Sequence, residues 1–155
     1  LVRMARFPPL GTRSAAGHLP QFGFQTYPAK IADPILESAT MIIPMIETLE
    51  ALENVEAILA VPGVDMVLVG SNDLTAEMGI AGDFDHPKLL DAYKRIIAAA
   101  RQQGKHVGIG GLAGRPDLTA DFVKLGARYV STGTDLGFLV GACMAKAREV
   151  HAMKG

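Results

Sequence analysis

The sequence IIPMIETLEALENVEAILAVPGVDMVLVGSNDLT (42–75) consists of two short apolar runs separated by an amphipathic segment. The first run ends at Glu47, and Asp73 follows the second run by three residues. Apolar residues recur at helical spacing between the runs, up to Pro62-Gly63, so the stretch predicts a strand, a helix and a second strand. Strands joined by a helical crossover are parallel, and both carboxylates should therefore leave the sheet at the same edge.

The rest of the chain continues this alternation. The pattern predicts strands at 41–46, 65–69, 106–109 and 129–131, and helices at 31–40, 49–61, 88–103, 118–125 and 136–150, with a short helix ending at Met78. We predict an α/β fold in one domain over 1–155, in which 31–150 holds the βα units and 1–30 is an irregular loop region. Short regular units with glycine-rich strand ends favour half of a (β/α)8 TIM barrel, whose full form needs about 250 residues, over a small doubly wound sheet.

The composition is that of a globular protein. The 155 residues are 49% hydrophobic and 20% charged, and the formal net charge is −1, which gives no reason to expect nucleic acid or a membrane surface as a partner. No apolar run approaches the roughly 20 residues of a membrane span. A single cysteine, Cys143, excludes an internal disulfide and is compatible with the cytoplasm, where we expect the protein.

Residues 1–30 are rich in Pro, Gly and Arg and show neither helical nor strand periodicity. Such a stretch is either a disordered chain end, with Arg3, Arg6 and Arg13 as solvated charges, or a loop at an active site or subunit contact. The chain begins at Leu1 rather than at methionine, and we therefore expect these residues to be part of a longer product.

Polar groups and glycines follow the predicted strands, at the edge of the sheet where barrel enzymes carry their functional residues. These strand ends hold Glu47, 70–73, 110–112 and 132–135. Carboxylates together with water and substrate oxygens suit Mg²⁺ or Mn²⁺, because these hard ions prefer oxygen ligands. Two protein ligands leave coordination positions open, and an open metal can polarise a bound carbonyl. The residues alone therefore predict a metal site.

Simpler structural roles account for the same residues. Asp73 and Asp135 both stand where a helix N-cap is wanted, and Glu47 precedes a helical first turn, where an acid stabilises the helix dipole. His86, which precedes a proline, has the pattern of a turn residue, and Cys143 among Ala and Met that of a packed helix residue. No Walker loop, GxGxxG, His-x-x-x-His or Cys cluster is present, which removes several other kinds of site.

Four segments carry a resemblance to a known family. MARFPPLGTRSAAG (4–17) has an arginine-aromatic-Pro-Pro-x-Gly-x-Arg loop, 45–87 is the longest match, and KHVGIGGLAG (105–114) and GARYVSTGTDLGFL (126–139) complete the set. Together they resemble the C-terminal portion of the HpcH/HpaI aldolase/citrate lyase family, the class II (metal-dependent) pyruvate aldolases that include 4-hydroxy-2-oxo-heptane-dioate aldolase.

The resemblance implies a phosphoenolpyruvate/pyruvate-domain-like (β/α)8 barrel, commonly hexameric, with the last helix exchanged between neighbours. It implies that Glu47 and Asp73 ligate Mg²⁺ or Mn²⁺, which chelates pyruvate and stabilises the enolate formed in reversible aldol cleavage. It also implies that backbone N–H groups near the aspartate bind the substrate carboxylate. The substrate-lining positions carried over are Ser71, Asn72, Asp73, Gly110, Gly111 and Leu112.

Two positions depart from the family pattern, and two functional residues lie elsewhere. The glutamine two residues before the metal glutamate is Met45 here, and the proline of Gly-Pro-x-Asp is Ser71. The histidine base and the pyruvate-binding arginine of the family lie upstream of this sequence. We therefore assign no catalytic residue, and if 155 residues are the whole molecule we expect weak or no aldolase activity.

These observations predict a metal-dependent carbon–carbon lyase that reversibly cleaves 4-hydroxy-2-oxo acids to pyruvate and an aldehyde. We expect a small 2-oxo acid as substrate, a homo-oligomer, and a loop at 6–13 that approaches the mouth of the site. Two alternatives stay open. One is a citrate lyase-like enzyme acting on an acyl-CoA thioester, and the other is a non-catalytic barrel fragment that is stable only in an oligomer, since a half barrel exposes two sheet edges.

Overall fold

A parallel sheet forms the centre of the computed structural model, which describes residues 1–153. The sheet consists of β1 (Met45–Ile46), β2 (Met66–Gly70), β3 (His106–Gly110) and β4 (Tyr129–Val130), in that order, and every neighbouring pair is parallel. Parallel strands in sequence order, joined by crossovers of one hand, place their helices on the same face, whereas a doubly wound sheet reverses its order to cover both faces. The strand order therefore favours the predicted half barrel over the doubly wound alternative.

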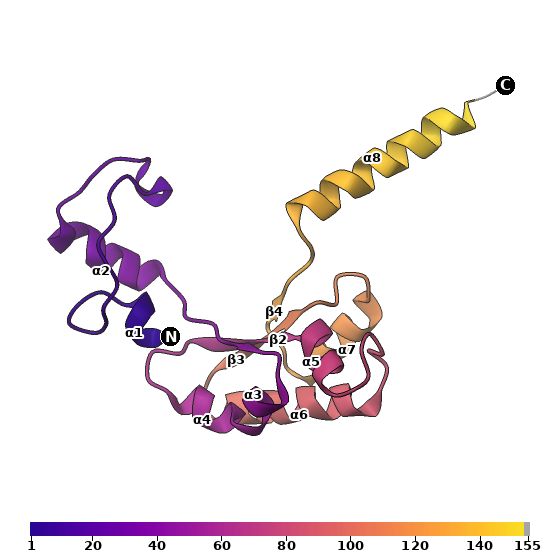
Figure 1. The fold of residues 1–155 in the computed structure, drawn as a ribbon, viewed down its shortest axis with the longest axis horizontal. Helices are drawn as coiled ribbons and strands as arrows, with labels where there is room; N and C mark the ends of the chain where they lie inside the picture. Colours follow the sequence, from indigo (N-terminus) through magenta and orange to yellow (C-terminus); the bar gives the residue numbers. More distant parts are fainter. Residues whose placement is uncertain (154–155) are drawn as a thin grey trace.

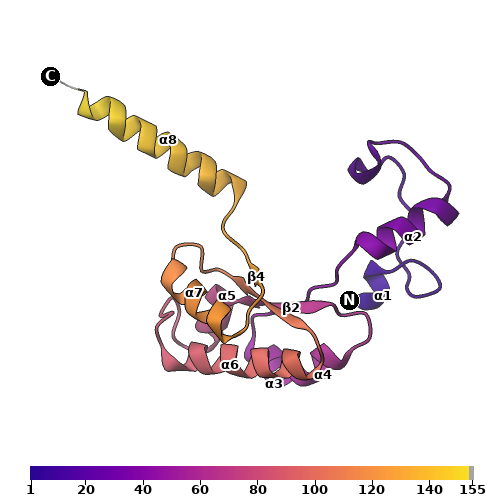
Figure 2. The ribbon, with the colours of Figure 1, turned by 180° about the vertical axis from the view of Figure 1, so that it is seen from behind.

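The helices are α1 (Val2–Ala5), α2 (Ala29–Ala39), α3 (Leu49–Glu53), α4 (Val55–Ala60), α5 (Ser71–Glu77), α6 (Pro87–Gln102), α7 (Pro116–Leu125) and α8 (Asp135–Ala152), with a 3₁₀ turn η1 (Pro20–Phe22). Some of the helices lie along one face of this sheet, whereas α1, α2 and α8 lie away from it (Figures 1 and 2). Figures 1 and 2 show α3, α4 and α6 side by side along the same face. The three later strands and the three long helices α6, α7 and α8 confirm the predicted elements to within two residues at each end.

Alternate residues of the central strands pack against these helices. Val67 and Val69 of β2 are fully buried, as are Val107 and Ile109 of β3. They belong to one apolar cluster to which α6 contributes seven buried side chains, namely Leu89, Ala92, Tyr93, Ile96, Ile97, Ala99 and Ala100. Full burial of one large aliphatic or aromatic side chain contributes about 1.5–3 kcal/mol, so this layer holds sheet and helices together.

The opposite face of the sheet has little room near its glycines. A Cβ atom on Gly108 would come within 2.8 Å of the Leu68 side chain and 2.9 Å of the Tyr129 ring. A Cβ on Gly110 would come within 2.9 Å of the Val69 carbonyl oxygen. Glycine at these positions allows bulky neighbours on adjacent strands to fill the space above the sheet.

Two predicted elements around the first strand are wrong in detail. The helix expected at 49–61 is divided into α3 and α4 by Asn54, whose side-chain amide donates to the Glu50 carbonyl and competes with helix continuation. The strand expected at 41–46 is confined to β1. The preceding residues still run beside β2, because the Ile42 carbonyl accepts from the Asp65 N–H at 3.0 Å and the Pro44 carbonyl from the Leu68 N–H at 2.9 Å. The regular strand starts only at Met45, since the Ile42 N–H donates to the Asp65 carboxylate at 2.6 Å and Pro44 has no N–H to donate.

The helix expected at 31–40 begins earlier than predicted. An aspartate followed by a proline is a pattern typical of an N-cap and a first helical position, but α2 starts at Ala29 and both Asp33 and Pro34 lie inside it. Pro28 takes the N-cap position instead. Pro34 is tolerated at the cost of one internal hydrogen bond, because it has no N–H to donate to the preceding turn.

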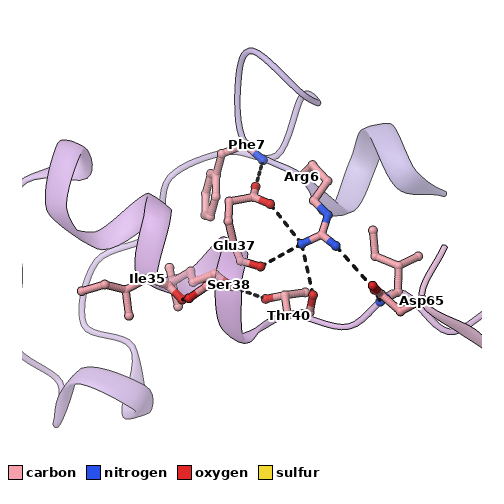
Figure 3. Close-up of polar contacts among 9 residues, drawn as sticks. Arg6, Phe7, Ile35, Glu37, Ser38, Thr40 and Asp65 are labelled. Carbon is pink, nitrogen blue, oxygen red and sulfur yellow. Dashed lines mark hydrogen bonds and ion pairs between the residues drawn. The ribbon is translucent and has the colours of Figure 1, made fainter. Parts of the chain in front are cut away.

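The N-terminal segment is tied to the sheet through Arg6, whose side chain is only 13% exposed. Its Nη1 donates to the Glu37 carboxylate at 3.0 Å and to the Thr40 carbonyl at 3.1 Å, and its Nη2 lies 3.5 Å from the Asp65 carboxylate (Figure 3). The Phe7 N–H donates to the other Glu37 oxygen at 2.5 Å. The predicted alternative of a disordered end with solvated arginines is therefore wrong for Arg6.

Helix α8 extends away from the sheet (Figures 1 and 2), and none of its described residues is buried. Large apolar side chains on it are exposed, among them Leu136, Phe138, Leu139 and Met144. Cys143 is exposed as well. The prediction that this cysteine is a packed helix residue is wrong, because α8 has no described neighbour against which it could pack. Among residues 1–153, no helix is both long and apolar enough to cross a membrane.

Substituting Arg6→Met tests the N-terminal tie. The variant keeps much of the apolar stem but removes the guanidinium donor from one Glu37 oxygen and from the Thr40 carbonyl, so we expect the free energy of unfolding to fall by about 1–3 kcal/mol. Urea denaturation measures this change. Arg3→Met is the matched control, because Arg3 is exposed. An equal effect of both substitutions would contradict the assigned role of Arg6.

Candidate functional site

Glu47 and Gly70 lie side by side at the carboxyl edge of the sheet. Ile46 pairs with Val69, so the next residue of each strand, Glu47 and Gly70, is level with the other. A Cβ atom on Gly70 would lie 2.9 Å from Glu47 Cβ, 3.2 Å from Glu47 Oε2 and 3.0 Å from Met45 Sδ. The Glu47 side chain therefore occupies the space that any residue larger than glycine would take at position 70.

Asp73 lies in the first turn of α5, which begins directly after β2. The N-cap of α5 is Gly70, so the predicted capping role of Asp73 is wrong. Asp135 does not cap α8 either, because Thr134 is the N-cap and its Oγ1 accepts from the Gly137 N–H at 3.2 Å. Side-chain capping by these aspartates thus does not explain their positions, although an acid in the first turn still stabilises the helix dipole.

Glu47 is also outside the helix that follows it. Thr48 caps α3 by accepting from the Ala51 N–H at 3.1 Å, and Glu50 is the acid in the first turn. The salt bridges among residues 1–153 all use carboxylates other than Glu47 and Asp73. Two carboxylates thus follow adjacent strands without a protein cation to balance either one.

The carboxylates of Glu47 and Asp73 are ligands of the kind that suit a hard cation with coordination positions left open for water or substrate. Among the described residues, no group of three or more His, Cys, Asp or Glu side chains is arranged to hold a metal. Two carboxylates with further oxygen ligands from water and substrate match the preference of Mg²⁺, which is usually held by one or two carboxylates. The chemistry of the two predicted residues, Glu47 and Asp73, therefore fits the expected ion.

A cleft of about 560 Å³ opens beside this edge, between the ends of β3 and β4 and the start of α8. Asn72 lines it from α5, and a Cβ on Gly111 would come within 2.9 Å of the Asn72 amide nitrogen. Gly111 also has φ of +80°, a conformation that favours glycine. The other lining residues are Ala113, Gly114, Ser131, Thr132, Gly133, Thr134, Gly137 and Phe138.

Not every predicted substrate residue presents its side chain here. Ser71 is fully buried and Leu112 is 2% exposed, so neither residue is open to a substrate in this chain. Gly110 is buried on the sheet, whereas Asn72 and Asp73 are exposed at the start of α5. The predicted set thus divides into the exposed positions 72, 73 and 111 and three buried positions that support them.

Residues at the other edge of the sheet take no part in this arrangement. Arg6 contacts Asp65, which precedes β2, so the prediction that the 6–13 loop approaches the mouth of the site is wrong for its first residue. His106 begins β3 and is exposed at the same amino edge. His86 caps α6 by accepting from the Lys88 N–H at 3.2 Å, which agrees with its predicted turn role.

Arg115 links two loops next to the cleft. Its guanidinium donates to both oxygens of Asp85 at 2.8 and 2.9 Å and to Asp117 at 2.7 Å, and its backbone N–H closes a turn onto the Leu112 carbonyl. Hydrogen bonds from Arg115 hold the pKa of Asp117 at about 2 and lower that of Asp85. The loop between α5 and α6 is thereby tied to the start of α7.

Sequence reasoning missed Tyr93 and Arg115. The Tyr93 hydroxyl lies 2.9 Å from the Ser71 hydroxyl in the core. A tyrosine on the apolar face of a predicted helix was an available signal, because a buried phenol needs a hydrogen-bond partner. Arg115 two residues before Asp117 suggested a local ion pair, but its bond to Asp85, 30 positions away in the sequence, depends on the tertiary fold.

Comparison with known proteins gives consistent matches. Residues 1–142 match the family described as HpcH/HpaI aldolase/citrate lyase. A 4-hydroxy-4-methyl-2-oxoglutarate aldolase of Hapsidospora irregularis is 36% identical over 155 residues, covering 99% of this chain and 57% of the relative. A 4-hydroxy-2-oxo-heptane-1,7-dioate aldolase of Escherichia coli is 35% identical over 155 residues, covering 97% and 56%.

The fold agrees with a solved structure. The crystal structure of an HpcH/HpaI aldolase from Desulfitobacterium hafniense DCB-2 has a TM-score of 0.79 and 29% identity, covering 99% of this chain and 59% of the other. This likeness, with the all-parallel sheet, confirms the predicted partial (β/α)8 barrel. The chain spans less than two thirds of the length of each of these three proteins.

Substituting Gly70→Ala tests the contact at the carboxyl edge. The added methyl group would meet Glu47 and Met45 at 2.9–3.0 Å, so we expect a loss of about 1–3 kcal/mol in unfolding free energy. Gly141→Ala is the matched control, because a Cβ there meets nothing within 4 Å and alanine favours the helix. Urea denaturation of both variants compares them, and equal stability would show that position 70 is not crowded.

The Arg115 link predicts how the loops respond to acid. Because the folded pKa of Asp117 is about 2 and its ordinary value 3.8, the contribution of its ionised form is fully present above pH of about 4 and is lost as pH falls through about 2. Carboxyl NMR shifts of Asp117 should follow this low midpoint. Arg115→Met should return the midpoint towards 3.8, whereas Arg101→Met should not move it. A low midpoint in Arg115→Met would show that another group lowers the pKa.

Proposed function

The chain belongs to the HpcH/HpaI aldolase/citrate lyase family, and we propose that it provides the metal-binding edge of an aldolase that reversibly cleaves 4-hydroxy-2-oxo acids to pyruvate and an aldehyde. The observation that carries the proposal is the packing of Glu47 against Gly70, the residue that directly precedes helix α5, whose first turn carries Asp73. Neither carboxylate has a salt bridge within residues 1–153, and both stand at the edge where barrels hold their reactive groups.

Glu47 and Asp73 would hold Mg²⁺ or Mn²⁺, and the bound ion would act as a Lewis acid on the keto oxygen of the substrate. Glu47 is half-buried and packs against Gly70, whereas Asp73 is exposed and can approach an ion from α5. The two ligands thus come from a rigid strand end and from a helix anchored in the core, which limits the geometries that they can adopt.

The substrate carboxylate would meet the backbone N–H groups of Asn72 and Asp73. These lie in the first turn of α5, where N–H groups have no intrahelical acceptor. The Asn72 side chain beside Gly111 would then face the part of the substrate that becomes the aldehyde, since it lines the 560 Å³ cleft. This arrangement supports a small 2-oxo acid held at one end by backbone donors.

Self-association is part of the proposal. Exposed Leu136, Phe138, Leu139 and Met144 on α8 leave apolar surface that another copy of the chain would cover. Burying such side chains is favourable at about 25 cal/mol per Å² of apolar surface, which supports a homo-oligomer.

Substituting Glu47→Gln tests the metal site. We expect the native chain to bind Mn²⁺ or Mg²⁺, with binding tightened by oxalate as a mimic of a 2-oxo acid. Glu47→Gln should weaken binding by about tenfold or more, because an anionic oxygen ligand becomes a neutral amide; this factor corresponds to about 1.4 kcal/mol. Titration calorimetry measures the affinities, and circular dichroism checks that the fold is kept.

Glu50→Gln is the matched control, since it removes an exposed carboxylate three residues along the chain without touching the site. Its metal affinity should equal that of the native chain. If the folded native chain bound neither ion with or without oxalate, the proposed function would fail. If Glu47→Gln bound as well as Glu50→Gln, Glu47 would be removed from the ligand set.

A further inference from the structure

Directly behind the first turn of α5, two hydroxyl groups meet in the core. The Ser71 Oγ and Tyr93 Oη atoms are 2.9 Å apart, and both residues are fully buried. Ser71 is the first residue of α5, and Tyr93 lies in the middle of α6. The reaction proposed above uses neither side chain, so the pair needs another explanation.

Tyr93 is packed against helix α7 on the side of its ring away from Ser71. The Tyr93 ring stacks on Phe122 of α7, with ring centroids 3.8 Å apart and an interplanar angle of 13°. Ser71 and Tyr93 satisfy each other's hydroxyl in the core, where an unpaired hydroxyl is costly. Burial also raises the pKa of Tyr93 well above its usual range, so the phenol stays protonated at working pH. The Tyr93 ring is thus held by packing against Phe122, and its hydroxyl contacts the Ser71 hydroxyl.

Helix α5 has a further buried hydroxyl, that of Thr75, closer to its C-terminal end. Thr75 is fully buried, and its Oγ1 donates to the Asn72 carbonyl at 2.9 Å and accepts from the Gly82 N–H at 3.3 Å. Ser71 and Thr75 are the buried polar residues of the described chain, and both belong to α5. A helix of seven residues has little stability of its own and depends on such tertiary contacts.

We propose that Tyr93 is a positioning residue, which through Ser71 sets where the first turn of α5 presents Asn72 and Asp73 beside the strand end that carries Glu47. The part of this inference that concerns metal affinity rests on the proposed function, whereas the anchoring of α5 concerns the ligand-free protein. No charge is involved, so the link acts by geometry and not by changing the charge of Asp73.

Tyr93→Phe and Ser71→Ala each remove one hydroxyl and keep most of the packing. Amide hydrogen exchange is measured at residues 75–78, whose N–H groups bond the carbonyls of 71–74, and is expressed relative to exchange in β2. We expect this ratio to rise about fivefold in each single variant. The double variant should exceed neither single one, because both substitutions remove the same bond.

Val55→Ala is the control for general loss of stability, since it removes buried methyl groups from α4, away from α5. It should lower the unfolding free energy and leave both the exchange ratio and Mn²⁺ affinity unchanged. Tyr93→Phe and Ser71→Ala should lower Mn²⁺ affinity by a similar factor of about five in titration calorimetry.

The outcomes separate this inference from the proposed function. An unchanged exchange ratio in Tyr93→Phe or Ser71→Ala would overturn the positioning role. A raised ratio with unchanged Mn²⁺ affinity, in a chain that binds Mn²⁺, would overturn its effect on the ligands. If the native chain bound no metal, the proposed function would fail, and the exchange ratio would still decide whether Tyr93 anchors α5.

Discussion

The close contact between the Glu47 side chain and the Gly70 backbone is the constraint on which the carboxyl edge depends. Parallel pairing of β1 with β2 makes these residues neighbours, and the missing side chain at position 70 lets the carboxylate lie across the strand. The same missing side chain is compatible with the abrupt change from β2 to α5, because Gly70 is also the N-cap of that helix. Gly70 therefore both contacts Glu47 and begins the helix that carries Asp73.

The placement of Asp73 depends on a different part of the core. α5 is short, and its orientation follows from the hydroxyls of Ser71 and Thr75, which are buried against α6 and the following loop. Position 73 is thus set by contacts on the side of the helix that faces away from solvent. Changes in the core behind α5 are expected to alter the site without touching any residue that meets the substrate.

The sequence was informative where periodicity and tertiary packing agree. The strand at 66–70 and the helix at 87–102 are buried on regular faces, so their apolar spacing was sufficient to predict them. The parallel arrangement of the first two strands followed from the βα alternation, which is why Glu47 could be placed at the carboxyl edge, whereas the pairing of Ile46 with Val69 is known only from the structure. Prediction failed at Asn54, where one side-chain hydrogen bond divides a helix, and at Arg6, whose partners lie 31 and 59 positions away. Contacts of that range leave no local pattern in a sequence.

The two edges of the sheet carry opposite kinds of electrostatic arrangement. At the amino edge, Arg6 bridges the carboxylates of Glu37 and Asp65, and the cluster holds the N-terminal segment in place. At the carboxyl edge, Glu47 and Asp73 stand without salt bridges within the described residues. Missing salt bridges alone do not mark a metal site, because other exposed carboxylates such as Glu50 and Glu77 have none within residues 1–153 either. What distinguishes Glu47 and Asp73 is their position after adjacent parallel strands, at the edge where barrels hold their reactive groups, and the proposed function depends on that position.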